Sequence, residues 1–387
     1  MLIIKKKDTV SLISVLSILV MTVLIISLLP LFSIAKYDMP LGDDSIYGDP
    51  VRSAFEQNTT LKTAFSAASG VVVEKYYSWQ GTFSAIFLMA LQPGVFGNEY
   101  YSITPYLMLA VLIVSIFFFL HTLICGVLHA PKNIWIIISA TIAFFSIQLP
   151  VSPREAFFWY NSAVYYTLFH SLLLILMALI ILLFRKKRVI AQTILVALCI
   201  LLSIVISGGN YATAMIAGEF LSCAIVYAAI KKRYKLLIPL ALMLLFFGAG
   251  MVISIAAPGN AVRQAAVIAS GYSQSGPIKT IVLSLALGGT MAIGWFNAAC
   301  VTIILLVVVF VGPYLKRSPW RFRYPLLIVA FLFCVFASAF APSVYAATSP
   351  GPYRLRNVVY FTYLIMIAFD TAYITGWAQH TVVKNDI

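Results

Sequence analysis

The sequence predicts an all-α integral membrane protein with about ten transmembrane helices, a long first outer loop and one short re-entrant or interfacial helix. The first observation behind this prediction is composition: of 387 residues, 62% are apolar and only 10% are charged, which is too few charges to cover soluble domains. The second is that the apolar residues form runs of about 20, the length that crosses a bilayer as a helix. The third is that Lys and Arg lie mainly between alternate runs, as the short cytoplasmic loops of membrane proteins require.

We expect residues 1–387 to form a single transmembrane domain whose helices are the apolar runs. The first run is about 26 residues long, whereas the apolar region of a cleaved signal peptide has about 7 to 15. We therefore interpret it as the first helix rather than as a signal peptide. Hydropathy places the helices at about 9–34, 104–129, 133–149, 157–184, 189–207, 211–230, 236–256, 280–312, 324–345 and 357–377.

The distribution of charge orients these helices. If the N-terminus is cytoplasmic, the short loops on that side hold 17 of the 26 Lys and Arg residues, mainly in clusters at 5–7, 185–188, 231–235 and 316–323. Acidic residues lie mostly on the other side. The sequence therefore predicts a multi-pass protein of the cell membrane with both termini cytoplasmic and its active face outward. Because these loops account for the net charge of +14, no nucleic-acid partner is indicated.

The outer loop at 35–103 is the longest stretch without a span. We expect it to begin as a loop at 38–44 and to be helical through 55–77. The piece from Trp79 to Phe96 is apolar but short, and Pro93 and Gly94 interrupt it. Such a piece suits a re-entrant or interfacial helix better than a span. If it did cross, every later helix would invert and the basic clusters would face outward.

Asp43 and Asp44 are the candidate catalytic residues. They follow the first helix in a turn flanked by Pro40 and Gly42, which fixes the backbone near the membrane surface. Neighbours in an extended stretch point to opposite sides, so one carboxylate can face a pocket while the other turns away or binds a divalent cation. A carboxylate in a partly desolvated pocket can act as a general base. The alternative is a solvated acidic turn.

Charged residues beside aromatic ones form two candidate binding clusters on the outer side. The first precedes the short helix and contains Glu74, Tyr77 and Trp79. Its rings either stack on a sugar or lie in the interfacial aromatic belt. The second follows the third predicted span and contains Arg154, Glu155 and Trp159. Its Arg–Glu pair is either a helix-terminal ion pair or part of the floor of a polar cavity.

Outer arginines are candidate phosphate ligands. Arg263 follows a turn at 257–260, and Arg354 and Arg356 follow Pro350-Gly351-Pro352. A guanidinium donates two parallel hydrogen bonds to a phosphate, so arginines from two separate loops can hold one headgroup together. The alternative is that they bind lipid headgroups of the membrane itself.

Other residues give less direct signals. Glu219 and Asp370 lie within predicted spans, where an acid is either functional or held by a structural polar contact. The five cysteines lie in apolar runs without metal-ligand spacing, so we expect core packing rather than disulfides or zinc. The motifs of P-loop ATPases, zinc proteases and nucleophile-elbow hydrolases are absent from the sequence.

Two short motifs resemble those of a known family. Trp79-Gln80-Gly81 matches a W-x-G-R element with Thr82 in place of Arg, and Ala257-Pro258-Gly259-Asn260-Ala261-Val262-Arg263 matches an A-P-G-N-x-x-R element in full. With an outer Asp pair just after the first helix, the chain resembles the GT-C superfamily of polytopic glycosyltransferases. It is similar in particular to a bacterial branch of membrane proteins that carry both elements.

The resemblance implies a polyprenyl-phosphate sugar as donor, membrane lipid as surroundings, and a glycan, glycolipid or cell-wall polymer as acceptor. It implies that Asp43 or Asp44 is the base or orients the acceptor. Arg263 and Arg354 would hold the phosphate, Asn260 would belong to the same binding element, and the aromatic residues near Trp79 and Trp159 would hold sugars. A phosphate departs without acid catalysis, so a single carboxylate suffices for an inverting displacement.

Two rival functions predict different patterns. A transporter or flippase for lipid-linked glycan predicts charges along a path through the bilayer, whereas only Glu219 and Asp370 lie at depth. An O-antigen-type polymerase predicts a large outer loop late in the chain, and the loop at 257–279 is modest. The sequence therefore favours a glycosyltransferase.

Overall fold

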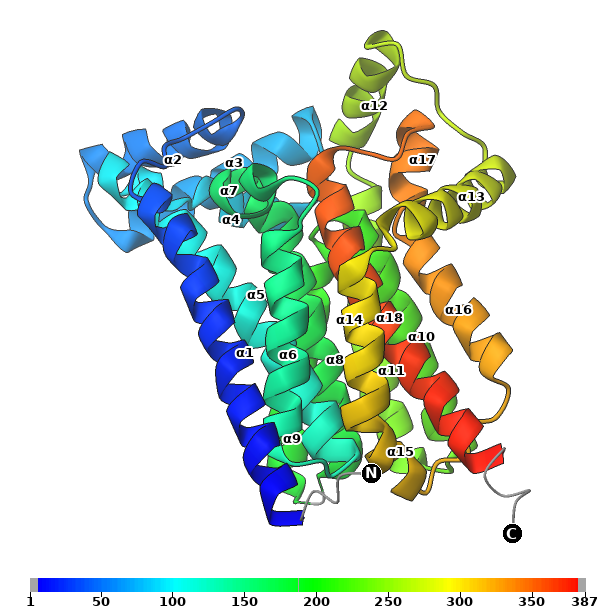
Figure 1. The fold of residues 1–387 in the computed structure, drawn as a ribbon. Coiled ribbons are helices and arrows are strands. Elements are labelled where there is room, and N and C mark those ends of the chain that lie inside the picture. The colour runs from blue at the N-terminus through cyan, green and yellow to red at the C-terminus, as the bar shows by residue number, and fades with distance from the viewer. Residues whose placement is uncertain (1–5, 187, 382–387) are drawn as a thin grey trace.

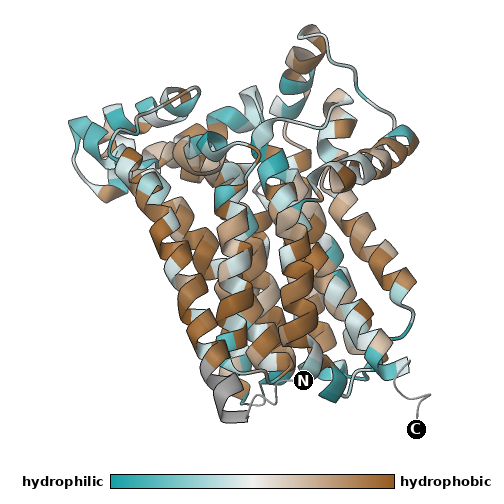
Figure 2. Ribbon diagram, in the orientation of Figure 1, coloured by the Kyte–Doolittle hydropathy of each residue, from teal (hydrophilic) through white to brown (hydrophobic). Residues whose placement is uncertain are grey.

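The computed structural model describes residues 6–186 and 188–381, and within these the chain is helical, with no strand (Figure 1). Nine helices of the described chain are long and apolar enough to cross a membrane, and a tenth counts if α16 and α17, bent by 44° at their junction, form one span. Apolar residues colour the long helices brown over most of their length in Figure 2, whereas hydrophilic residues gather at the two ends of the bundle. The chain is therefore an all-α multi-pass membrane protein, as the sequence predicts.

The long helices run side by side between two ends that differ in charge. The end that contains the start of α1 also contains the end of α18, Arg185, Lys186 and Arg188, and the links at 231–233 and 316–323, and we call it the basic end (Figure 1). We call the opposite end, where the short helices lie, the capped end. The helices of the bundle are α1 (Lys6–Ala35), α5 (Thr104–His121), α6 (Lys132–Gln148), α8 (Phe169–Arg185), α9 (Val189–Ser207), α10 (Tyr211–Ile230), α11 (Tyr234–Ile255), α14 (Ala298–Leu306), α15 (Gly312–Arg317), α16 (Pro325–Ser338) and α18 (Tyr353–Thr381).

The prediction of one long helix at 280–312 is wrong. The structure has α13 (Pro277–Trp295) and α14, separated by an extended turn at Phe296 and Asn297. The Asn297 side chain accepts a hydrogen bond from the Ala299 backbone N–H at 2.9 Å, so it caps a new helix that starts in another direction. Figure 1 shows α13 lying across the capped end, while α14 runs toward the basic end.

The segment after α1 begins with the predicted loop, at 36–43, and then forms three helices at the capped end, the first of which starts at Asp44 rather than at Phe55. They are α2 (Asp44–Gln57), α3 (Leu61–Ser78) and α4 (Phe83–Ala90). The predicted helix at 55–77 is broken at 58–60, where Thr60 Oγ1 accepts from the Thr63 backbone N–H at 3.1 Å and so starts α3. With eight residues, α4 is too short to cross a bilayer, which confirms the prediction of a short non-spanning helix.

These helices are held by small apolar contacts. Buried Ala64, Ala68 and Val71 follow one another at helical spacing on α3, and buried Tyr47 and Val51 do so on α2. The two helices pack against each other and against α4. Residue Asp43, directly before α2, is thereby fixed above the bundle.

The cysteines are free in the described chain, and their predicted place in the core holds for only some of them. Cys199 and Cys300 are buried, Cys125 is half-buried, and Cys223 and Cys334 are exposed. Exposed positions on spanning helices face lipid, which satisfies an apolar side chain as well as a protein core does.

The predicted helix at 157–184, which starts at the second candidate binding cluster, is also broken. A single turn at Arg154–Phe158 ends at Trp159, whose backbone is extended, and α7 (Tyr160–Ala163) starts directly after it. A further turn at Val164–Leu168 leads into α8. The extended backbone at Trp159 separates the Arg154–Phe158 turn from α7, and the Trp159 indole packs against Gly42 in the loop before α2.

Candidate functional site

Asp44 is a buried structural anchor. Its side chain is completely buried, and one carboxylate oxygen accepts from the Leu41 backbone N–H at 2.9 Å and from the Tyr101 hydroxyl at 2.5 Å. The other oxygen accepts from the Asn161 backbone N–H at 3.1 Å. Burial raises the pKa of Asp44, and these three donors act in the opposite direction. Through these contacts Asp44 ties three segments of the chain together.

Asp43 occupies the opposite situation. Its side chain is only half-buried, and the one hydrogen bond that it accepts from the described residues, from Asn161 Nδ2 at 3.3 Å, is long. Asp44 is thus buried and Asp43 remains accessible, although the Asp43 backbone, with φ −89 and ψ 7, is not extended and both carboxylates accept from Asn161. Asn161 contacts both of them, which fixes the loop relative to α7.

Tyr47 lies at the centre of the charged residues. One helical turn after Asp43, it is buried, and it interacts electrostatically with Asp43, Arg263 and Arg354. Burial raises the pKa of its hydroxyl, with Asp43 acting in the same direction and the two arginines against it. The ammonium of Lys75 lies 5.7 Å from the centre of the Tyr47 ring. One carboxylate and three cations from four segments of the chain thus interact with the same tyrosine.

The two motifs pack directly against each other. Arg263 donates a hydrogen bond to the side-chain oxygen of Gln80, and the Gly81 backbone N–H donates to Asn260 Oδ1 at 3.2 Å. A Cβ on Gly259 would lie 2.4 Å from the Trp79 backbone nitrogen, so only glycine permits this approach. Trp79-Gln80-Gly81 and the 257–263 turn, nearly 180 residues apart, therefore form one unit.

This unit supports a first prediction about the folded state. A Cβ at Gly81 would lie 2.0 Å from the Ser254 carbonyl oxygen, so we expect Gly81→Ala to destabilise the protein by about 1–3 kcal/mol through displaced backbone. Thermal unfolding of the purified protein in detergent measures this. Gly70→Ala is the matched control because a Cβ there meets nothing within 4 Å in α3, and we expect it to be neutral or to stabilise by roughly 0.5–1 kcal/mol. Equal unfolding temperatures for both variants would contradict the packing argument.

Trp159 joins the Asp43 loop to Arg354. The Arg354 guanidinium lies 4.8 Å from the indole centre, a cation–π contact, and a Cβ on Gly42 would lie 2.7 Å from the same indole. Gly42 has φ +60, which its lack of a side chain allows. The Trp159 indole N–H is buried without a hydrogen-bond partner in the described chain. The Glu155 carboxylate accepts from the Arg354 backbone N–H at 2.8 Å and so holds the start of α18.

Neither a protein-family model, nor a curated protein, nor a solved structure matches this chain. The candidate site therefore has to be judged on its own geometry.

Four of the residues predicted for the site lie outside this arrangement. Glu74 and Tyr77 are exposed on α3, and the only ion pair among the described residues joins Glu74 to its neighbour Lys75 at 2.8 Å. Arg154 is exposed and makes no ion pair with Glu155, so the predicted helix-terminal pair does not form. Arg356 turns away to the Tyr353 ring, 4.5 Å from its centre, and to the Gly351 carbonyl.

The structure adds residues that the sequence interpretation did not place in the site. Tyr47, Lys75 and Gln80 belong to helices or turns whose packing faces are set by distant segments. Asp38 is the second omission: one of its carboxylate oxygens is buried without a partner, and burial raises its pKa to about 7. Asp38 interacts with Asp44 and Tyr101, on the anchor's side of the loop.

Two further features bear on the site. The described residues contain no group of three or more His, Cys, Asp or Glu side chains that could hold a metal ion.

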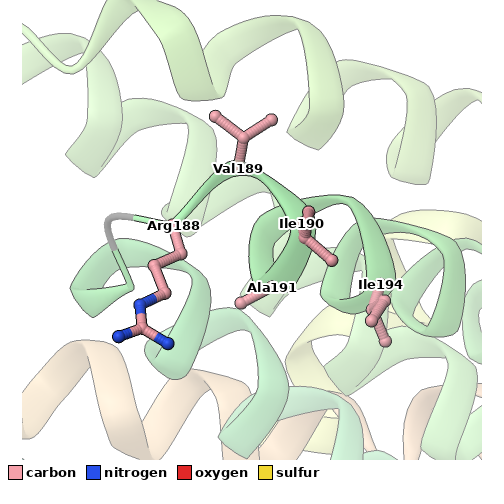
Figure 3. Close-up of a pocket in the computed structure, with 5 residues that line it drawn as sticks. All are labelled: Arg188, Val189, Ile190, Ala191 and Ile194. Atoms are coloured by element: carbon pink, nitrogen blue, oxygen red, sulfur yellow. The ribbon is translucent and has the colours of Figure 1, made fainter.

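A surface hollow of about 560 Å³ lies at the basic end, lined by Arg188 and by Val189, Ile190, Ala191 and Ile194 of α9. Figure 3 shows these apolar side chains spread along the start of α9, with the Arg188 guanidinium to one side. Val189 and Ile190 are among the most exposed apolar residues of the chain, as expected of a lipid-facing surface.

Proposed function

We propose that this chain is a membrane glycosyltransferase that moves a sugar from a polyprenyl-phosphate donor to a cell-surface glycan, glycolipid or cell-wall polymer. The observation that carries the proposal is the convergence of an accessible carboxylate with cations on one tyrosine. Asp43, Arg263 and Arg354 all interact with Tyr47, and Lys75 lies against its ring. This transfer requires cations that stabilise the anionic phosphate leaving group and a base that takes the proton of the attacking acceptor hydroxyl.

The chemistry assigns each charge a role. The acceptor hydroxyl attacks the anomeric carbon, and its proton passes to Asp43. The bond between the anomeric carbon and the phosphate oxygen breaks, and its electron pair leaves with the phosphate. Arg263 and Arg354 stabilise the charge that develops there, as preorganised donors do in many enzymes. Asp44 serves as the anchor that holds Asp43, because its own hydrogen-bonding capacity is used within the protein.

The surroundings fit this assignment. Gln80 and Asn260 hold Arg263 on the rigid motif unit, so its guanidinium is positioned before substrate arrives. Trp159 offers an aromatic face near Asp43 for a sugar ring, next to the cation of Arg354. The half-exposed Trp79 and the exposed Tyr77 lie on the same end of the bundle, where rings of this kind contact lipid headgroups.

We further propose that the capped end faces outward and that both termini are cytoplasmic. The basic clusters all lie at the opposite end of the bundle, and short cytoplasmic loops are rich in Lys and Arg. The donor would then enter from the outer leaflet, at the level of α12 (Gly259–Ala269) and α13.

The matched arginines of α18 test the function. In a deletion strain we expect surface glycans to lose one sugar substituent, measured by mass spectrometry together with the lipid-linked intermediates. Arg354→Gln should restore the substituent about 10- to 100-fold less well than wild type, because a charge-assisted contact to phosphate is lost. Arg356→Gln should restore it fully, since this guanidinium turns toward Tyr353.

Other results would support other functions. An unchanged sugar composition in the deletion strain, with a complete lipid-linked glycan accumulating, would indicate a transporter or flippase instead of a transferase. Shorter glycan chains built from intact repeats would indicate a polymerase. Equal loss of activity in the Arg354→Gln and Arg356→Gln variants would mean that Arg354 does not bind the phosphate.

A further inference from the structure

The second half of α2 and the segment Val95–Asn98 enclose a cleft of about 350 Å³ that the proposed catalytic group does not use. We call it the α2 cleft. Its volume is within the range of small-molecule sites. It lies in the capped end, where α2 is largely hydrophilic (Figure 2).

The cleft is fixed before any ligand binds. Arg52 donates to the Gly94 carbonyl at 2.6 Å and to the side-chain oxygen of Asn98, so α2 is tied to the following segment. The Phe55 and Phe96 rings meet edge to face, with centroids 5.1 Å apart. The walls of the cleft therefore come from two segments that cannot easily separate.

The lining combines apolar faces with polar groups of mixed type. Phe55 and Phe96 supply partly exposed aromatic surface, and Thr59 and Asn98 supply a hydroxyl and an amide. The Glu56 carboxylate is exposed and has no hydrogen-bond or ion-pair partner among the described residues. The one cation, Arg52, uses a single guanidinium nitrogen, Nη2, for the Gly94 carbonyl and the Asn98 amide oxygen, so its other N–H groups can donate to ligand hydroxyls. Aromatic faces for C–H groups and acceptors for hydroxyls are what a sugar ring requires.

The α2 cleft and Asp43 lie at opposite ends of one helix. Glu56 is twelve residues after Asp44, and at 1.5 Å per residue the helix separates them by roughly 18 Å. A single sugar cannot fill this distance, whereas several linked sugars can.

We propose that the α2 cleft binds a distal sugar of the acceptor, so that the acceptor is an extended glycan laid along α2 with its reactive end at Asp43. This inference rests on the proposed function, because it assigns the class of acceptor for the same reaction. The acceptor is thereby a chain of several sugars rather than a lipid with one sugar.

Binding of defined glycan fragments to the full-length protein in nanodiscs tests this. The probes are oligosaccharides released from the surface glycans of the deletion strain, labelled with a fluorophore and sorted by size, and the readout is fluorescence polarisation. We expect fragments of four or more sugars to bind wild type about tenfold more tightly than single sugars. Thr59→Trp, which fills the cleft, and Glu56→Gln should both remove this difference. Glu74→Gln, an exposed carboxylate change on α3 and outside the length of α2, should leave it intact.

The outcomes separate this inference from the proposed function. If Thr59→Trp binds long fragments as wild type does, the cleft proposal is wrong even when Arg354→Gln abolishes transfer. If long fragments bind and Thr59→Trp prevents it, while the deletion strain keeps its sugar composition, the cleft is a glycan site of a protein that is no transferase. If Thr59→Trp fails to fold, its unfolding temperature shows this, and the binding of long fragments by Glu56→Gln then tests the cleft proposal.

Discussion

Asp44→Ala is expected to lower the free energy of unfolding by roughly 4 kcal/mol or more, enough to prevent accumulation of the folded protein. The carboxylate accepts hydrogen bonds from the Leu41 and Asn161 backbones and from the Tyr101 hydroxyl; Tyr101 and Asn161 are buried and Leu41 is half-buried. Alanine leaves three donors without an acceptor, each of which then carries its full desolvation cost. Few single substitutions in this chain remove so many buried contacts.

The measurement is thermal unfolding of the purified protein in detergent, with yield as a second readout. Asp49→Ala is the matched control, because Asp49 is an exposed carboxylate on the same helix. We expect its free energy of unfolding to stay within about 0.5 kcal/mol of wild type. A similar unfolding temperature for Asp44→Ala and wild type would mean that the three donors find water instead, and that Asp44 is no anchor.

The tyrosine that binds Asp44 extends this argument to the rest of the loop. The Tyr101 hydroxyl donates to Asp44 and accepts from the Tyr160 backbone N–H at 3.0 Å. The Gln92 side chain adds a contact of 2.5 Å to the Asp44 carbonyl. The loop before α2, the segment before α5 and the break before α7 are therefore fixed to one another by polar contacts. Asp43 is held at the edge of this network, where a reacting group needs both rigidity and access.

Hydropathy was sufficient to predict the membrane-spanning helices, because a bilayer demands long apolar segments wherever the chain crosses it. It could not predict the break at Asn297 within the apolar stretch at 280–312. One polar residue in such a stretch is compatible with a span, and only the capping contact to Ala299 shows that it starts a new helix. The start of α2 at Asp44 was missed for a related reason, since Gly48 and Pro50 disfavour a helix locally. Tertiary packing of Tyr47 and Val51 overrides them.

The charged residues of the candidate site were found from the sequence, but their roles were not. Asp43 and Asp44 are adjacent and chemically equal, and what separates them is Asn161 and Tyr101, which lie 57 to 118 positions away. Of the three outer arginines, Arg356 has the same local sequence setting as Arg354 and yet turns toward another ring. Lys75 was not among the candidates, because its approach to Tyr47 depends on how α3 packs on α2. Contacts between residues so far apart in the chain leave no pattern in the local sequence.

Asp43→Asn is expected to reduce the transferred sugar by about 10²- to 10⁴-fold, the usual effect of removing a general base. Asparagine keeps the shape of the side chain and an oxygen for Asn161 Nδ2, so the loop should retain its conformation. We expect the free energy of unfolding to change by no more than about 0.5 kcal/mol. The amount of the sugar substituent in the complemented deletion strain, divided by the amount of protein in the membrane, measures the effect.

Asp38→Asn is the comparison that makes this result specific. Asp38 is the other carboxyl group of the loop with an unsatisfied oxygen, and a pKa near 7 is suited to a base. Its electrostatic partners are Asp44 and Tyr101, whereas Asp43 interacts with the tyrosine that faces Arg263 and Arg354. We therefore expect Asp38→Asn to retain most of the transfer. If instead Asp38→Asn abolished transfer and Asp43→Asn did not, the base would be Asp38, and the donor phosphate would have to lie on the Tyr101 side of the loop.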